Sequence, residues 1–207
     1  MAGVADRILK RVAARGRGQW VCTPKDFLDL GSRPAIDQAL SRLVKAGKLR
    51  RLSQGLYDMP RVSRVLNRAA PPNIDAAIAA IARRDGVRIM PAGLAAANQL
   101  GLTNAVPAKS VYVTDGSSRQ LKIDGRTIQF RHAGPGTMQW SGRPAASVAQ
   151  ALRWLGPSAV KDVHVISILK RTLPDTVKRD LSRNSRGLPG WALALVRELE
   201  TDSAIAA

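Results

Sequence analysis

The hydrophobic pattern of the first 60 residues predicts three short helices followed by a β-hairpin. Apolar residues spaced three or four positions apart indicate a first helix that ends before Gly16. Thr23 is a good N-cap and Pro24 a good first residue for a second, short helix. Ser32 caps a third helix over about residues 33–46. Two helices joined by a short glycine-containing turn are typical of a helix-turn-helix.

The third predicted helix has one apolar and one polar face. Its apolar positions are Ile36, Ala39, Leu40, Leu43 and Val44. Its opposite face has no large apolar side chain and consists of Pro34, Gln38, Ser41, Arg42 and Lys45. Glutamine can pair with adenine and arginine with guanine in a major groove, so this face predicts a surface that reads DNA. A merely solvated helix face is the alternative.

Alternating residues after this helix predict a wing. The two strands are 49–52 and 56–58, joined by a turn at Ser53-Gln54-Gly55. Lys48, Arg50 and Arg51 are suited to phosphate contacts. We therefore predict a winged helix-turn-helix domain over 1–62, and a linker over 63–73 that contains Pro71-Pro72.

The remainder, 74–207, predicts an α+β domain with a small antiparallel or mixed sheet packed by helices. A small-residue helix near 91–102 precedes strands at 110–114, 120–123 and 126–132. Asp124-Gly125 between the last two strands is a strong hairpin signal. Helical periodicity returns after Ala145 and continues to the Ala-rich tail.

The charge balance favours an anionic partner. Lys and Arg total 33 against 15 Asp and Glu, a formal net charge of +18. Residues 1–68 hold 15 of these cations and only 5 of the acids, so the excess is densest in the predicted DNA-binding domain. The few aromatic residues there disfavour single-strand stacking, which makes duplex DNA the expected ligand.

The predicted DNA contacts come from the third helix, its start, and the wing. They are Arg33, Pro34, Gln38, Ser41, Arg42, Lys45, Lys48, Arg50, Arg51 and Gln54. Further nucleic-acid contacts are expected from Arg17, Lys25, Arg119, Lys122, Arg126 and Arg131.

The sequence offers little for catalysis. His132 and His164 fall in separate predicted elements, and the single cysteine, Cys22, lies in an apolar setting. Neither a metal site nor a cofactor is expected, and we predict that the protein is not an enzyme. No stretch is apolar enough to cross a bilayer, so we expect no membrane partner and a cytoplasmic location.

Two stretches of the sequence carry a family pattern. The first reads LGSRPAIDQALSRLVKAG followed by LRRLSQGLYDMP, and the second reads MPAGLAAANQLGLTNAVPAKSVYVTDGSSRQLKIDGRTIQFRH. Together they resemble AbiEi-type antitoxins, the bacterial transcriptional regulators of type IV toxin–antitoxin systems. The resemblance covers about residues 5–200, although the tail from Pro174 onward does not match motif by motif.

The resemblance implies a repressor. Its winged helix would bind inverted repeats in its own promoter, and its C-terminal domain would counter a toxin of nucleotidyltransferase type without forming a stable complex. Two alternatives stay open: a solitary DNA-binding regulator with no toxin, and an interaction module for RNA or an acidic protein. The sequence leaves the operator and the oligomeric state undetermined.

Overall fold

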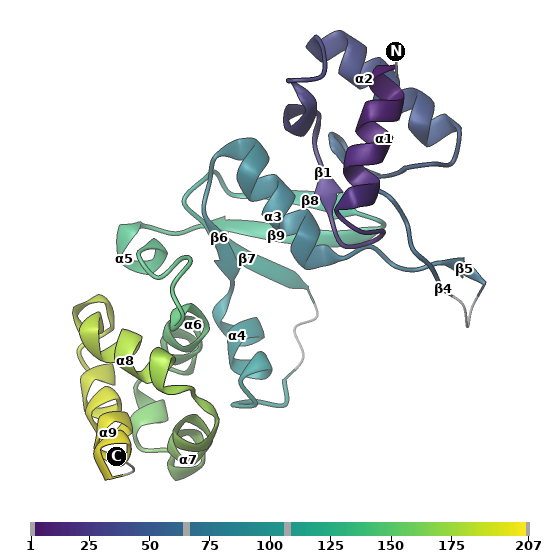
Figure 1. Cartoon of the computed structure of the whole chain (residues 1–207). Coiled ribbons are helices and arrows are strands. Elements are labelled where there is room, and N and C mark those ends of the chain that lie inside the picture. Colours follow the sequence, from purple (N-terminus) through teal and green to yellow (C-terminus); the bar gives the residue numbers. More distant parts are fainter. Residues whose placement is uncertain (1–2, 64–66, 106–108, 206–207) are drawn as a thin grey trace. The chain divides into compact units, whose positions relative to one another are not determined.

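The computed structural model describes residues 3–63, 67–105 and 109–205, and its architecture is mixed α+β (Figure 1). The chain forms two compact units. The first comprises residues 1–87 together with 121–127, and the second comprises 88–120 together with 128–207.

The first unit places three helices and a 3-10 turn around short antiparallel strands. A three-stranded sheet has the order β1-β3-β2, and β4 pairs with β5 in a separate ribbon. The elements are α1 (Val4–Ala14), β1 (Val21–Cys22), η1 (Pro24–Phe27), α2 (Arg33–Lys45), β2 (Arg50–Ser53), β3 (Leu56–Asp58), β4 (Val62–Ser63), β5 (Arg68–Ala69) and α3 (Ile74–Asp85).

Most of the local predictions for this unit are confirmed. The third predicted helix is α2, with Ser32 as its N-cap, and the predicted hairpin is β2–β3. The predicted second helix is instead the single 3-10 turn η1. Thr23 and Asp26 form a capping box at its start, where the Thr23 amide and hydroxyl donate to the Asp26 carboxylate at 2.7 and 3.1 Å. The Leu30 amide then bonds to the Phe27 carbonyl three residues back, so the chain never reaches α-helical spacing.

The core of the first unit fixes α2 in place. Ile36 and Leu40 of α2 are fully buried against Ile8 and Val12 of α1 and Phe27 of η1. This packing uses the predicted apolar stripe and leaves the other side of α2 outward.

Helix α3 also belongs to the first unit, which differs from the predicted division at residues 63–73. Its buried residues Ala77, Ile78, Ala80 and Ile81 pack toward β1 and β3. These contacts join segments about 20 to 60 residues apart, and periodicity alone does not reveal such pairings. The predicted linker also contains the β4–β5 ribbon, while its residues 64–66 lie outside the described residues.

The second unit contains most of a four-stranded mixed sheet of order β6-β7-β9-β8, while residues 121–127 at the β8–β9 turn belong to the first unit. Strands β6 and β7 run antiparallel and β7 and β9 run parallel, so the mixed alternative of the prediction is confirmed. Its elements are β6 (Ile89–Pro91), α4 (Gly93–Gln99), β7 (Ser110–Thr114), β8 (Arg119–Ile123), β9 (Arg126–His132), α5 (Pro135–Met138), α6 (Ala146–Leu155), η2 (Pro157–Val160), α7 (Val163–Thr172), α8 (Asp175–Arg183), η3 (Ser185–Gly187) and α9 (Ala192–Ile205).

The hairpin signal between β8 and β9 is also confirmed. Asp124 and Gly125 both have positive φ angles, 49° and 79°, as a tight two-residue hairpin turn requires.

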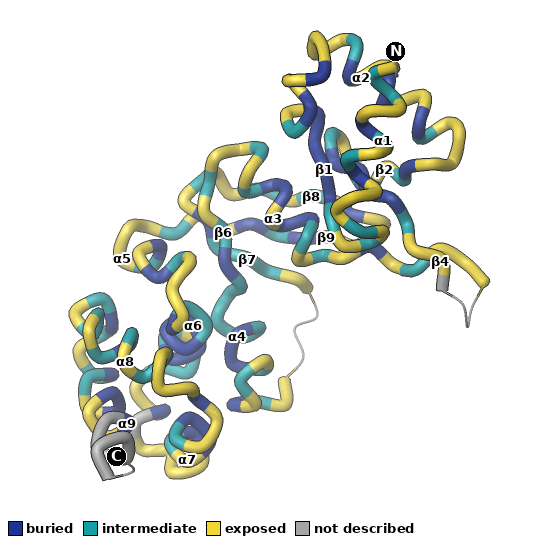
Figure 2. The backbone as a smooth tube through the Cα atoms, in the orientation of Figure 1, coloured by how far each residue is buried: buried dark blue, intermediate teal, exposed yellow. Residues whose placement is uncertain are grey.

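Helix α6 is the centre of the helical core of the second unit (Figure 2). Residues 148–152 of α6 are all buried. The small-residue helix α4 packs against it, and a Cβ atom on Gly93 would lie 2.4 Å from the Trp154 Cβ and 2.7 Å from the Gln150 carbonyl oxygen. Helix α4 therefore packs closely against α6.

Among the described residues, no helix is long and apolar enough to cross a membrane.

Candidate nucleic-acid interface

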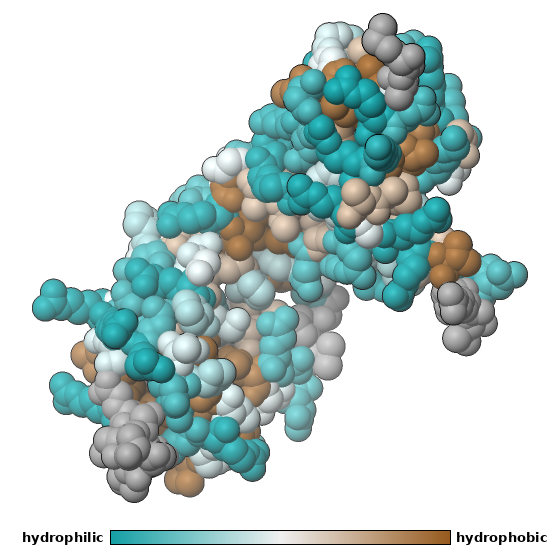
Figure 3. Space-filling model, in the orientation of Figure 1, coloured by the Kyte–Doolittle hydropathy of each residue, from teal (hydrophilic) through white to brown (hydrophobic). Residues whose placement is uncertain are grey.

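The outward face of α2 is polar and cationic along its whole length. The predicted contacts on this face are all exposed, namely Pro34, Gln38, Ser41, Arg42 and Lys45. Hydrophilic side chains cover much of the visible surface over α1 and α2 (Figure 3). Because Ile36 and Leu40 hold the opposite face in the core, α2 presents these polar groups from a fixed backbone.

In the described part of the chain, the cations in the middle and at the end of this face have no acidic partner. Within the described residues, neither Arg42 nor Lys45 makes an ion pair or a side-chain hydrogen bond. At the start of the helix, the Arg33 Nε donates to the Asp37 carboxylate at 2.8 Å across one exposed turn. Exposed pairs of this kind contribute little to stability, so an incoming phosphate can compete for Arg33.

Two neighbouring arginines of β2 differ sharply in their contacts. Arg50 makes a bidentate pair with Asp58, at 3.0 and 2.7 Å, and also donates to the Ala70 carbonyl at 3.0 Å. The Asp58 side chain is only 1% exposed and that of Arg50 21%. The hydrogen bond to Asp58 raises the pKa of Arg50 above its ordinary value. Arg51, in contrast, is exposed and has no side-chain partner among the described residues.

The Arg50 guanidinium is thus engaged in holding the hairpin together. Its register explains why: Arg50 lies directly opposite Asp58 in the β2–β3 ladder. Of the two arginines predicted to contact DNA from the wing, Arg51 is the one whose head group is available.

A cationic cavity of about 420 Å³ lies in the first unit, between η1, the start of α2, the β2–β3 turn and α3. It brings together three predicted contacts, Lys25, Arg33 and Gln54, and adds Arg84 of α3, which the sequence analysis missed. The Lys25 Nζ donates to the Arg84 carbonyl at 2.6 Å, and the Arg84 guanidinium donates to the Gln54 carbonyl at 3.1 Å.

Arg84 also pairs with Asp85 at 2.8 Å, so the cavity keeps a net positive charge from three cations and one acid. Donors of this kind, converging on one hollow, suit a phosphate group. The basic residues at the C-terminal end of α3 can be recognised in the sequence. However, no local pattern indicates that Arg84 contacts the β2–β3 turn.

The remaining predicted contacts are scattered. Arg17 and Lys48 line a second cavity of about 430 Å³ in the first unit, beside Met59. Lys122 and Arg126 are exposed near the β8–β9 turn. In the second unit, Arg119 lies over the Phe130 ring at 5.4 Å and is only partly exposed. Arg131, also in that unit, is exposed.

The candidate chemical groups do not come together into a reactive site. Burial raises the pKa of the Cys22 thiol to about 12, and its Sγ donates to the Tyr57 carbonyl at 3.3 Å. His132 lies at the end of β9, with its Nδ1 3.1 Å from the Gly116 carbonyl oxygen. His164 is exposed in the first turn of α7.

Within the described parts of the chain, no three His, Cys, Asp or Glu side chains group in a way that could hold a metal ion.

Comparisons with known proteins give a family but no activity. The model of DUF6088, a family of unknown function, matches residues 7–180. No curated protein matches the sequence. Among solved structures, the crystal structure of RV2827C protein from Mycobacterium tuberculosis is similar, with a TM-score of 0.44 and 18% sequence identity. That match covers 94% of this chain and 81% of the other, and so distant a likeness supports no functional conclusion.

Proposed function

Because the chain belongs to the DUF6088 family, a family of unknown function, we propose its function from its own residues: it is a sequence-specific, double-stranded DNA-binding transcriptional regulator. The observation that carries this proposal is the outward face of α2. That face holds Gln38, Ser41, Arg42 and Lys45 exposed on a helix anchored by its buried side, and no described residue is an acidic partner for its two cations.

The order of elements in the first unit supports a winged helix-turn-helix as the binding device. Strand β1 precedes the short turn η1 and the helix α2. The β2–β3 hairpin follows them in the position of a wing and completes the three-stranded antiparallel sheet. In such domains the helix that follows the turn enters the major groove, and the wing contacts the backbone. On this proposal α2 reads bases, with Gln38 and Arg42 as its base-reading residues.

The backbone contacts come from cations beside α2. Arg51 and Lys48 supply one group, and the cavity lined by Lys25, Arg33 and Arg84 supplies a second place for a phosphate. These contacts fix the position on the duplex without carrying sequence information. They account for the concentration of positive charge in the first unit.

The test of base reading uses Arg42→Ala and Gln38→Ala. Operator sites are first selected from random duplexes, and affinity for the operator and for a scrambled duplex is then measured. Each variant should lose about tenfold or more in operator preference, since a bidentate base contact contributes about 1–3 kcal/mol of discrimination. Lys10→Ala, an exposed cation on α1, is the matched control. Unchanged preference in both α2 variants would remove this helix from the interface.

The test of the backbone contacts is the salt dependence of binding. Arg51→Ala and Lys48→Ala should each weaken binding to every duplex and reduce the salt slope by about one unit. A slope equal to that of the unaltered protein would take the hairpin out of the interface.

The resemblance to AbiEi-type antitoxins extends the proposal to an autoregulating repressor in the bacterial cytoplasm, acting on inverted repeats. A neighbouring reading frame for a nucleotidyltransferase-like toxin would favour the antitoxin over a solitary regulator. Co-expression of that toxin with this protein would then measure neutralisation. Gel shifts with duplex DNA, RNA and single strands separate the regulator from an RNA-binding module, because only the regulator prefers the duplex.

A further inference from the structure

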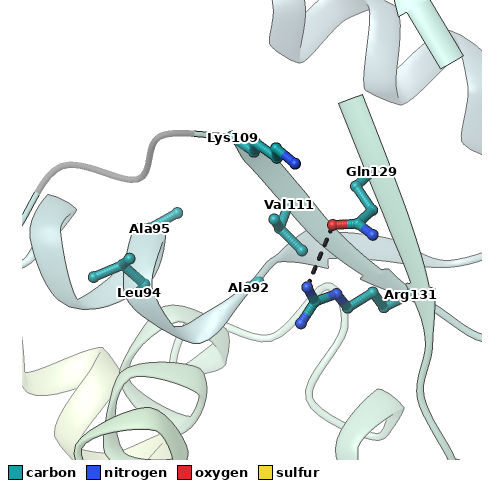
Figure 4. Close-up of a pocket in the computed structure, with 7 residues that line it drawn as sticks. All are labelled: Ala92, Leu94, Ala95, Lys109, Val111, Gln129 and Arg131. Carbon is teal, nitrogen blue, oxygen red and sulfur yellow. Dashed lines mark hydrogen bonds between the residues drawn. The ribbon is translucent and has the colours of Figure 1, made fainter. Parts of the chain in front are cut away.

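The second unit contains an open cavity of about 400 Å³ that the proposed DNA binding does not use. It lies between α4 and the strands β7 and β9 (Figure 4). Leu94 and Ala95 lie on the helix side, Gln129 and Arg131 lie on the β9 side, and Val111 of β7 lies between them. The volume suits a small organic ligand.

One wall of this cavity is apolar because of how α4 is packed. Gly93, Ala96 and Ala97 place one side of the helix against α6, and both alanines are fully buried. Leu94 and Ala95 therefore fall beside that interface and stay only half-buried, facing the cavity. An apolar wall that no described residue covers favours contact with an apolar group of a ligand.

The strand register supplies the polar side. Val111 lies opposite Gln129 in the parallel β7–β9 pair, and alternate residues of a strand share a face. Arg131 therefore follows Gln129 on the same face. Lys109 lies in the bend just before β7 and also lines the cavity, so two cations border it.

Neither of these two cations has an acidic partner among the described residues. The Arg131 guanidinium donates only to the neighbouring Gln129 side chain, at 3.3 Å, and Lys109 makes no side-chain hydrogen bond within the described residues. Among the side chains that the structure describes, no carboxylate lies at ion-pair distance from either head group. Elsewhere in the same unit, Arg88 is paired with Asp115 at 2.8 Å.

Cations without counter-ions beside an apolar wall are complementary to a molecule with an anionic head and an apolar body. We propose that this cavity binds a small organic acid. Its anionic head contacts Lys109 and Arg131, and its apolar body packs against Leu94, Ala95 and Val111. A nucleic-acid backbone would use the cations but leave the apolar wall empty, so an organic acid is the better fit. The inference does not depend on DNA binding by the first unit.

The first experiment measures binding of simple acids to the full chain by calorimetry and ligand-observed NMR. Octanoate carries both a head and a body, whereas acetate and inorganic phosphate carry only a head. We expect octanoate to bind at least about tenfold more tightly than either, because each buried methylene contributes about 0.8 kcal/mol.

The second experiment assigns that binding to the cavity. Arg131→Gln and Lys109→Gln should each weaken octanoate binding by about tenfold, the value of one charge-assisted contact. Ala95→Phe should reduce it by at least as much by filling the cavity from the apolar side. Arg171→Gln, an exposed cation on α7, is the matched control and should bind normally. Far-UV circular dichroism of each variant verifies that the fold is kept, and Arg131 and Lys109 are both exposed substitutions that the fold tolerates.

Four outcomes would overturn the proposal. The first is no octanoate binding to the unaltered chain, and the second is acetate binding as tightly as octanoate. The third is undiminished binding in all three cavity variants. The fourth is chemical-shift change at the cavity residues with duplex DNA but with none of the acids. Loss of DNA binding in the α2 variants would leave this result untouched, so the two proposals fail separately.

Discussion

The β2–β3 hairpin and the outward face of α2 use positive charge in opposite ways. In the hairpin, Arg50 is bonded to Asp58 and to the Ala70 carbonyl, and the carboxylate is almost fully buried. On α2, Arg42 and Lys45 are exposed and lack an acidic partner among the described residues. In the hairpin the positive charge stabilises the fold, whereas on α2 it stays available to a ligand.

The difference shows that the number of cationic residues overstates how many of them a partner can contact. The 33 Lys and Arg residues include arginines paired with carboxylates, such as Arg11 with Asp29 at 2.6 Å and Arg143 with Asp180 at 3.2 Å. An anionic partner contacts mainly the cations that are not paired with a carboxylate. Their positions, more than their number, indicate where it binds.

The largest expected effect is the loss of stability in Arg50→Ala. This change leaves the buried Asp58 carboxylate without its partner, which should cost on the order of 3 kcal/mol of unfolding free energy. Urea denaturation measures it, with Arg51→Ala as the matched control on the same strand, expected within about 0.5 kcal/mol of the unaltered protein. Equal losses of unfolding free energy in the two variants would show that Arg50 contributes no more to the fold than Arg51 does.

A double replacement refines this first result. Arg50→Met combined with Asp58→Leu removes both charges and retains apolar volume, so much of the lost stability should return. If the double variant is as unstable as Arg50→Ala, the ion pair itself contributes more than desolvation of the lone carboxylate.

The second expected effect concerns the α2 face. Arg42→Ala with Lys45→Ala should change the unfolding free energy by no more than about 0.5 kcal/mol, because neither head group has a partner to lose. The same double variant should bind duplex DNA more weakly. A substantial fall in melting temperature would mean that these cations serve the fold, as Arg50 does.

The smallest expected effect is acid sensitivity at Asp115 in the second unit. Hydrogen bonds from the Arg88 side chain and amide lower the pKa of this carboxyl below its ordinary value of 3.8. A lowered carboxyl pKa stabilises the fold above the ordinary value, and this contribution is lost as the pH falls through the folded-state value. In Arg88→Gln the Asp115 pKa should rise toward 3.8, which a carbon-detected NMR titration measures. If the Asp115 pKa is the same in Arg88→Gln as in the unaltered protein, the backbone amide of residue 88 alone lowers it.

The sequence predicted the first unit best where local rules decide the structure. The start of α2 after Ser32, its buried stripe and the Asp124-Gly125 turn all follow from residues within a few positions of one another. The exposed face of α2 follows from the same periodicity. For these features the local and tertiary preferences agree.

The rest depended on contacts that the local pattern does not contain. The Arg50–Asp58 pair needs the β2–β3 register, and α3 joins the first unit through contacts with distant strands. Arg84 reaches the Gln54 carbonyl from 30 residues away. The cavity beside Arg131 requires a parallel pairing of β7 with β9, and the sequence analysis left the sheet either antiparallel or mixed.

The close approach of α4 to α6 has a genetic consequence. Every amino-acid replacement at Gly93 adds at least a Cβ atom, and that atom collides with the Trp154 Cβ and with the Gln150 carbonyl, part of the backbone of α6. No missense change at this codon is therefore sterically neutral, whatever the polarity of the new residue. In a library of all single substitutions, every replacement at position 93 should be depleted after selection for folded protein. The exposed Gln99, at the other end of the same helix, should accept many residues.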